Sequence, residues 1–137
     1  MQTVLENSKR TFENIHSYSY PINMLKGVII SIILTLLFLF IFANILTYTN
    51  ISESTISPVI ITITAISILI GSSLATIKIK KNGVINGALL GFIYISIIYI
   101  LSSISKTGFI FNFSSLIMMC ISLLSGAIGG IVGVNLK

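Results

Sequence analysis

The side chains that could carry out acid–base, nucleophilic or metal chemistry are few and lie apart in the sequence. The chain has one histidine, His16, one cysteine, Cys120, and no aspartate. A zinc site of histidine and cysteine ligands needs three or four such residues close together. The long apolar segments hold no base that could activate their serines. We therefore expect no catalytic residue, no metal site and no cofactor, and we predict that the protein is not an enzyme.

The polar side chains that could line a transport pathway are hydroxyls and amides. The apolar segments contain no Asp, Glu, Lys, Arg or His, which disfavours a proton-coupled antiporter or a charged pore ring. Thr64, Ser67 and Ser122 are the hydroxyls that could line a narrow path, and Asn86 is the amide. Buried hydroxyls and amides also form hydrogen bonds within and between membrane helices. We favour this packing role for them.

Small residues form a second pattern along the apolar segments. Gly83, Gly87 and Gly91 follow one another at four-residue steps, so they share one narrow face of a helix. Without side chains, they allow the backbone of a second helix to approach closely. The complete set of expected helix-packing residues is Gly71, Ala75, Gly83, Gly87, Gly91, Gly126, Gly129, Gly130 and Gly133. Such faces indicate tight packing within the chain or a seam between copies of it.

Four long apolar segments must position these residues. The chain of 137 residues is 55% hydrophobic and only 8% charged, whereas soluble domains are about 25% charged. A membrane span needs about 20 apolar residues, and the expected spans are 27–48, 57–77, 83–102 and 113–134. Because a helix satisfies its own backbone hydrogen bonds in lipid, we predict an all-α integral membrane four-helix bundle. We divide the chain into an N-terminal segment, 1–24, and a four-span domain, 25–137.

The N-terminal segment is polar, with a weak apolar stripe at helical spacing through Leu5, Phe12 and Ile15. Such a stripe is typical of a helix that lies on the membrane surface, and a frayed terminus is the alternative. Pro21 is expected to stop any preceding helix or to start the next one.

The basic residues predict the orientation of the spans, because lysine and arginine accumulate in cytoplasmic loops. Seven of them fall on one side of the predicted topology, namely Lys9, Arg10, Lys26, Lys78, Lys80, Lys81 and Lys137, and only Lys106 falls on the other. We predict a multi-pass protein of the cell membrane with both termini in the cytoplasm. Lys78, Lys80 and Lys81 could also hold anionic lipid head groups, although topology alone accounts for them. The expected partners are the lipid bilayer and another membrane protein or further copies of the chain, with no nucleic acid.

The small residues also suggest an internal repeat. Gly27 and Gly83 open the first and third spans, and Gly71 and Gly126 lie near the ends of the second and fourth. Two parallel helical hairpins would explain this order. The alternative is that any tightly packed bundle places small residues where its helices converge.

The order of these motifs resembles a known family. The resemblance rests on the motifs Leu25-Lys26-Gly27, Asn82-Gly83, Asn86-Gly87-Ala88 with Gly91, and Ser125-Gly126-Ala127-Ile128-Gly129-Gly130 with Gly133-Val134-Asn135. From Leu25 to Lys137 the chain is similar to the YrzE-like small membrane proteins of Firmicutes, which have four predicted spans and no assigned function. The resemblance implies an association with secretion at most, and it assigns no functional residue.

Two hypotheses for function follow. The first is a non-enzymatic accessory or scaffold subunit that packs through its glycine-rich helix faces. The second is a small oligomeric channel or facilitator for a neutral solute or an ion. The scarcity of charge and the abundance of packing faces favour the first.

Overall fold

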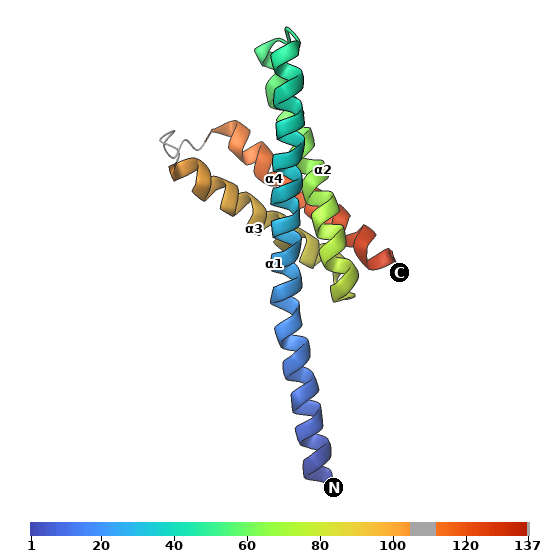
Figure 1. Ribbon diagram of the computed structural model, residues 1–137. Coiled ribbons are helices and arrows are strands. Elements are labelled where there is room, and N and C mark those ends of the chain that lie inside the picture. The colour runs from blue at the N-terminus through green and yellow to red at the C-terminus, as the bar shows by residue number, and fades with distance from the viewer. Residues whose placement is uncertain (105–111, 137) are drawn as a thin grey trace.

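The computed structural model contains four helices joined by short connections (Figure 1). It describes residues 1–104 and 112–136, and for residues 15–18 it describes the backbone alone. The helices are α1 (Gln2–Tyr48), α2 (Glu53–Ile79), α3 (Gly83–Ile104) and α4 (Phe113–Asn135). Each is long and apolar enough to cross a membrane. The structure thus confirms the predicted all-α fold, and we describe the chain as a membrane protein.

Helix α1 is one continuous helix of 47 residues with Pro21 in its interior. The prediction that Pro21 would end one helix or begin another was wrong. A proline in a helix interior removes one hydrogen bond and costs about 3 kcal/mol, but packing on both sides of Pro21 opposes a break. Tyr20 donates a hydrogen bond to Asn86 of α3, and Met24, one turn later, is buried in the core.

The length of α1 is about 70 Å at 1.5 Å per residue, more than twice the thickness of a hydrocarbon core of about 30 Å. Its N-terminal part therefore projects well beyond the other three helices (Figure 1). We call residues 2–19 the α1 arm. The α1 arm is helical and continues the axis of the first span, so the frayed alternative is wrong. The position of the arm relative to a membrane surface stays a prediction.

The other helices lie close to their predicted bounds. Helix α2 begins at Glu53, so Pro58 lies inside the helix and not in its first turn. The acidic Glu53 side chain complements the positive end of the helix dipole there. The turn after α2 is tight: Lys80 and Asn82 have φ values of 56° and 45°, and the Lys80 amide donates to the Thr76 carbonyl at 3.0 Å.

The four helices form two antiparallel hairpins, α1–α2 and α3–α4, which cross obliquely (Figure 1). Helix α2 contacts all three other helices, whereas the described residues of α1 and α4 do not contact each other. The core lies where the hairpins cross and consists of Met24, Val28, Ile68, Ala75, Leu90 and Tyr94.

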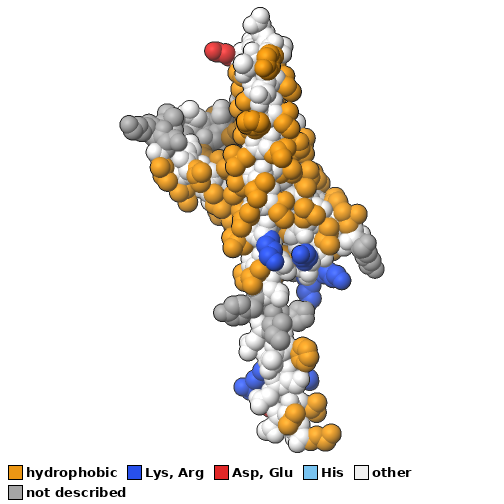
Figure 2. All heavy atoms as spheres, viewed as in Figure 1, with side chains coloured by type: hydrophobic (Ala, Val, Ile, Leu, Met, Phe, Trp, Pro, Cys, Tyr) orange, Lys and Arg blue, Asp and Glu red, His pale blue; other side chains and the backbone are white. Residues whose placement is uncertain are grey.

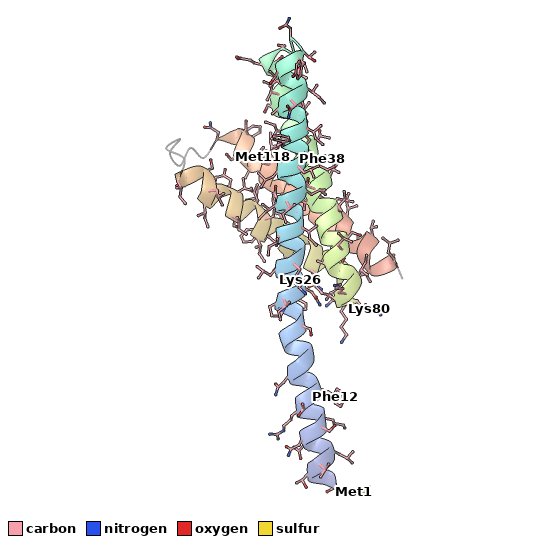
Figure 3. All side chains as sticks on the ribbon, in the orientation of Figure 1. Met1, Phe12, Lys26, Phe38, Lys80 and Met118 are labelled. Carbon is pink, nitrogen blue, oxygen red and sulfur yellow. The ribbon has the colours of Figure 1, made fainter. Side chains whose placement is uncertain are left out.

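The outer surface of the crossing helices is mostly hydrophobic (Figure 2). Large side chains such as those of Leu36 and Phe40 are exposed there, which is the surface expected next to lipid acyl chains. Lysine side chains gather at the end of this surface nearest the α1 arm, and Lys26 and Lys80 lie at a similar level (Figure 3). Lys106 and Lys137, which were used to predict the orientation, lie outside the described residues.

Candidate functional site

The closest helix contact is the seam between α3 and α4, where glycine backbones face each other. A Cβ atom on Gly87 would lie 2.8 Å from the carbonyl carbon of Gly126 and 2.8 Å from the Cα of Gly130. A Cβ atom on Gly83 would lie 2.9 Å from the carbonyl carbon of Gly130. Contacts this short leave no room for any side chain, so the two helices touch through their backbones.

One hydrogen bond crosses the same seam. The Ser122 hydroxyl on α4 donates to the Gly91 carbonyl on α3 at 2.8 Å, and the bond is buried. Because Gly91 has no side chain, this carbonyl is open to the neighbouring helix in addition to its own turn.

The α1–α2 hairpin has an equivalent seam. Gly27 of α1 packs against Gly71 and Ala75 of α2, and a Cβ atom on Gly27 would lie 2.5 Å from that of Ala75. A Cβ atom on Gly71 would clash with Ser31. The Ser31 hydroxyl in turn donates to the Gly27 carbonyl at 3.0 Å.

The contacts in the two hairpins correspond position by position. Gly27 contacts Ala75 in the first hairpin, and in the second Gly83, 56 residues after Gly27, contacts Gly130, 55 residues after Ala75. This correspondence of contacts supports an internal repeat of the hairpin. The repeat is not a full two-fold arrangement, since α2 contacts α3 while α1 and α4 do not meet.

The hairpins are joined by a third seam, between α2 and α4. Gly129 faces the Ser72 hydroxyl and the backbone of Leu69, and Gly133 faces the Thr76 hydroxyl and the backbone of Ser73. All nine residues predicted for helix packing lie in these three seams, with Gly91 facing the Ser122 carbonyl in the seam between α3 and α4.

The hydroxyls proposed as pathway lining are already engaged. Thr64 donates to the Ile60 carbonyl at 2.9 Å, and Ser67 donates to the Ile63 carbonyl at 2.9 Å. Thr64 and Ser122 border one cavity between α2 and α4, but its volume is about 10 Å³. A cavity of that size holds about one water molecule, so this cavity is too small for a larger solute.

A buried link between α1 and α3 was missed by the sequence analysis. Tyr94 is completely buried, and its hydroxyl lies 2.9 Å from that of Thr35. The Thr35 hydroxyl donates to the Ser31 carbonyl at 2.8 Å, so the Thr35 oxygen accepts the hydrogen bond from the Tyr94 hydroxyl. The available signal was the position of Tyr94, three residues after Gly91 and therefore on nearly the same face of α3.

A polar cavity of about 610 Å³ lies at the base of the α1 arm. Its lining comes from α1, from the end of α2 and from the start of α3: Ser19, Tyr20, Asn23, Lys78, Ile79, Lys80, Lys81, Asn82 and Asn86. Asn86 lies here and not in a pathway through the bundle. Its amide nitrogen donates to the Lys81 carbonyl at 2.6 Å and its oxygen accepts from Tyr20, so it ties the α2–α3 turn to α1. We call this feature the basic cavity.

The charges of the basic cavity are unbalanced. Its described lining contains three lysines and no carboxylate. The salt bridge found among the described residues joins Arg10 to Glu6 in the α1 arm, at 2.9 Å. The amino-terminal end of α3 adds the positive end of a helix dipole. The arrangement can attract and hold an anion.

An apolar groove of about 210 Å³ adjoins the basic cavity and shares Tyr20 with it. It runs between α1 and α3 and is lined by Tyr20, Pro21, Met24, Leu25, Val28, Leu89 and Ile93. The three lysines of the basic cavity are near neighbours in the sequence and could be grouped from it. The sequence pattern did not predict that Tyr20 and Asn23 line the same cavity, nor that the groove exists. Their only signal was the four-residue spacing of Tyr20, Met24 and Val28.

The geometry that a metal site requires, three or four ligand side chains close together, can be compared with the residues that the structure describes. Within residues 1–104 and 112–136, leaving aside the side chains of 15–18, no group of three His, Cys, Asp or Glu residues could hold a metal ion. Cys120 is exposed on the outer face of α4. The side chain of His16 lies outside the described residues.

Comparison with known proteins identifies one family. Neither the curated proteins nor the solved structures contain a match to this chain. Residues 21–133 match the family described as "Protein of unknown function (DUF3792)". That match covers most of the sequence, from Pro21 in α1 to Gly133 near the end of α4, so the chain belongs to this family.

Proposed function

We propose that this member of a family of unknown function is a non-enzymatic accessory or scaffold subunit of the cell membrane. The observation that carries the proposal is the use of the polar groups inside the bundle. Ser31, Thr35 and Ser122 all form hydrogen bonds that hold helix to helix or helix to itself. An interior whose hydroxyls are used in this way for packing is suited to a rigid structural subunit.

The α1 arm is the part best placed to contact a partner. Val4, Leu5 and Phe12 are between 59% and 71% exposed and lie within about 100° of one another around the helix at 100° per residue. The ion pair of Glu6 and Arg10 lies on the other side. Because the arm continues the axis of a span, it leaves the membrane surface, and its apolar face is available to an amphipathic helix of a partner protein.

We place both ends of the chain in the cytoplasm, because the lysines at the base of the arm lie at one end of the hydrophobic surface. The same end carries the α2–α3 turn. In this orientation the partner of the arm is cytoplasmic or is a membrane protein with a cytoplasmic part. A nucleic acid partner is not proposed, since the basic residues are spread along the membrane boundary.

The finer relationship that we propose is to the YrzE-like proteins of Firmicutes. The proposal rests on the glycine and asparagine motifs from Leu25 onward, in particular Asn86-Gly87-Ala88 and Ser125-Gly126. It is consistent with an accessory role in secretion.

Affinity purification of the full chain in mild detergent tests the accessory role. We expect a defined partner that is released by Phe12→Glu and retained by Asn14→Glu, which adds the same charge on the opposite side of the arm. Quantitative mass spectrometry of both eluates provides the readout. If wild-type protein returns neither a partner nor an oligomer, the accessory role is wrong.

A small oligomeric channel or facilitator for a neutral solute or an ion is the alternative. The cavity of about 10 Å³ beside Thr64 and Ser122 means that any path would have to form between copies of the chain. Flux of a panel of neutral solutes and ions into liposomes containing the purified protein tests this alternative. Flux no greater than into empty vesicles would argue decisively against it.

A further inference from the structure

The basic cavity and the apolar groove lie side by side in the order of the parts of a phospholipid. On α1, Tyr20 and Asn23 line the cavity, and Met24 and Val28 line the groove. On α3, Asn86 lines the cavity, and Leu89 and Ile93, one and two turns further along, line the groove. Both helices thus change from polar to apolar in the same direction, away from the arm.

The position of this pair of sites matches the boundary of a bilayer. Lys80, which lines the cavity, and Lys26 lie at a similar level, where the hydrophobic surface of the bundle ends (Figures 2 and 3). From Asn86 to Ile93 the α3 axis rises about 10 Å, which is within one leaflet of a hydrocarbon core of about 30 Å. With the bilayer boundary at this level, the cavity lies at head-group depth and the groove at acyl-chain depth.

We propose that the basic cavity and the apolar groove together bind one anionic phospholipid, with its phosphate among Lys78, Lys80 and Lys81 and an acyl chain along the groove.

The chemistry of the cavity selects an anion. Ammonium groups bind phosphate as point charges, and the absence of a lining carboxylate leaves the three charges uncompensated. The Asn23 and Asn82 side chains add amide donors at its wall. The volume of about 610 Å³ is sufficient for a glycerophosphate head group.

The groove distinguishes a lipid from free phosphate. It presents Met24, Val28 and Ile93 beside the cavity, and no part of a soluble phosphate would occupy this apolar surface. Burial of methylene groups there contributes about 0.8 kcal/mol each relative to water, but it gains little relative to lipid. The groove therefore orients and aligns the acyl chain, while the lysines provide the preference for negative charge.

The test uses the purified full chain in a neutral detergent and native mass spectrometry. The probes are palmitoyl-oleoyl phosphatidylglycerol, phosphatidylcholine with the same acyl chains, and inorganic phosphate. We expect one phosphatidylglycerol per chain, bound at least about tenfold more tightly than phosphatidylcholine and not displaced by millimolar phosphate. A lysine near an anionic head group contributes about a fivefold factor, equivalent to about 1 kcal/mol.

Two pairs of variants locate the site. Lys80→Gln combined with Lys81→Gln should weaken phosphatidylglycerol binding about 25-fold, whereas Lys26→Gln, at a similar level but outside the cavity, should change it less than twofold. Leu89→Trp should obstruct the groove and weaken binding, whereas Leu101→Trp, an exposed position on the same helix, should not. Circular dichroism without added lipid establishes that each variant is folded.

Three outcomes would overturn the proposal. If phosphatidylglycerol and phosphatidylcholine bound equally, the site would have no preference for a negatively charged head group. If the double lysine variant and Lys26→Gln bound phosphatidylglycerol equally, the basic cavity would not be the lipid site. Complete displacement by phosphate, with Leu89→Trp behaving as wild type, would identify a site for a soluble anion instead. None of these outcomes depends on the partner of the α1 arm, so this proposal and the accessory role fail separately.

Discussion

A single added methyl group at Gly87 should open the seam between α3 and α4. In Gly87→Ala the new Cβ would lie 2.8 Å from both the Gly126 carbonyl carbon and the Gly130 Cα, and nearer still to the Gly126 carbonyl oxygen. Carbon atoms prefer separations of about 3.5–4.0 Å. Because every one of these neighbours is backbone, no side-chain rotation can relieve the clash, and the helices must separate by roughly 1 Å.

The cost of that separation has two parts. Overpacking a tight interface costs about 1–3 kcal/mol. The buried hydrogen bond from Ser122 to the Gly91 carbonyl, 2.8 Å long, lies one turn along the same seam and would be stretched, which adds about 0.6 kcal/mol. We therefore expect Gly87→Ala to lower the free energy of unfolding by about 2–3 kcal/mol, and Gly87→Leu to lower it further.

The assay is unfolding of the purified protein by sodium dodecyl sulfate in mixed micelles, followed by far-ultraviolet circular dichroism. Val84→Ile is the matched control, because it adds one carbon to the same helix at a position that is 51% exposed. It should leave the unfolding curve unchanged. If the free energy of unfolding of Gly87→Ala instead equals that of the wild type to within about 0.5 kcal/mol, as for a surface substitution, the seam does not depend on backbone contact at Gly87.

Three further predictions concern other parts of the bundle. Gly129→Leu should separate α4 from α2 and lower stability in the same assay, and an unchanged unfolding curve would contradict the packing drawn for that face. Tyr94→Phe should cost about 0.6–1.5 kcal/mol, because it removes one buried hydrogen bond between helices and keeps the ring; a loss above about 3 kcal/mol would show that the ring itself has moved. For orientation, Ser52→Cys and Leu136→Cys in a Cys120→Ala background should react with an impermeant maleimide from outside and inside the cell, respectively, and the reverse pattern would invert the topology.

The helices could be predicted because lipid leaves few alternatives. Apolar runs long enough to span a bilayer must be helical or form a barrel, so Gly83 and Phe113 were placed correctly as the first residues of α3 and α4. The prediction for Pro21 was wrong because the sequence shows only the local cost of a proline in a helix. The contacts of Tyr20 and Met24 that keep the helix continuous depend on the fold.

The candidate site shows the same division. The glycine spacing at Gly83, Gly87 and Gly91 identified a face that a second backbone could approach, but not which glycine of α4 would lie opposite each one. The lysines of the α2–α3 turn are adjacent in sequence and were grouped at once. Tyr20 joins them only because α1 passes beside the turn in the fold, although Tyr20 lies 66 residues before Asn86 in the sequence. No pattern within a single helix predicts such a contact.

The continuity of α1 through Pro21 gives the molecule a mechanical property. The 20 or so residues before the core form a rod of about 30 Å. The rod continues the helix of the first span without a break, and the hydrogen bond between Tyr20 and Asn86 anchors it at its base. A tilt of the membrane-embedded half by about 10° would carry the far end sideways by about 5 Å. Any change in bilayer thickness that tilts the span is thus amplified into a displacement at Met1, so that the arm converts a property of the membrane into a movement at its tip.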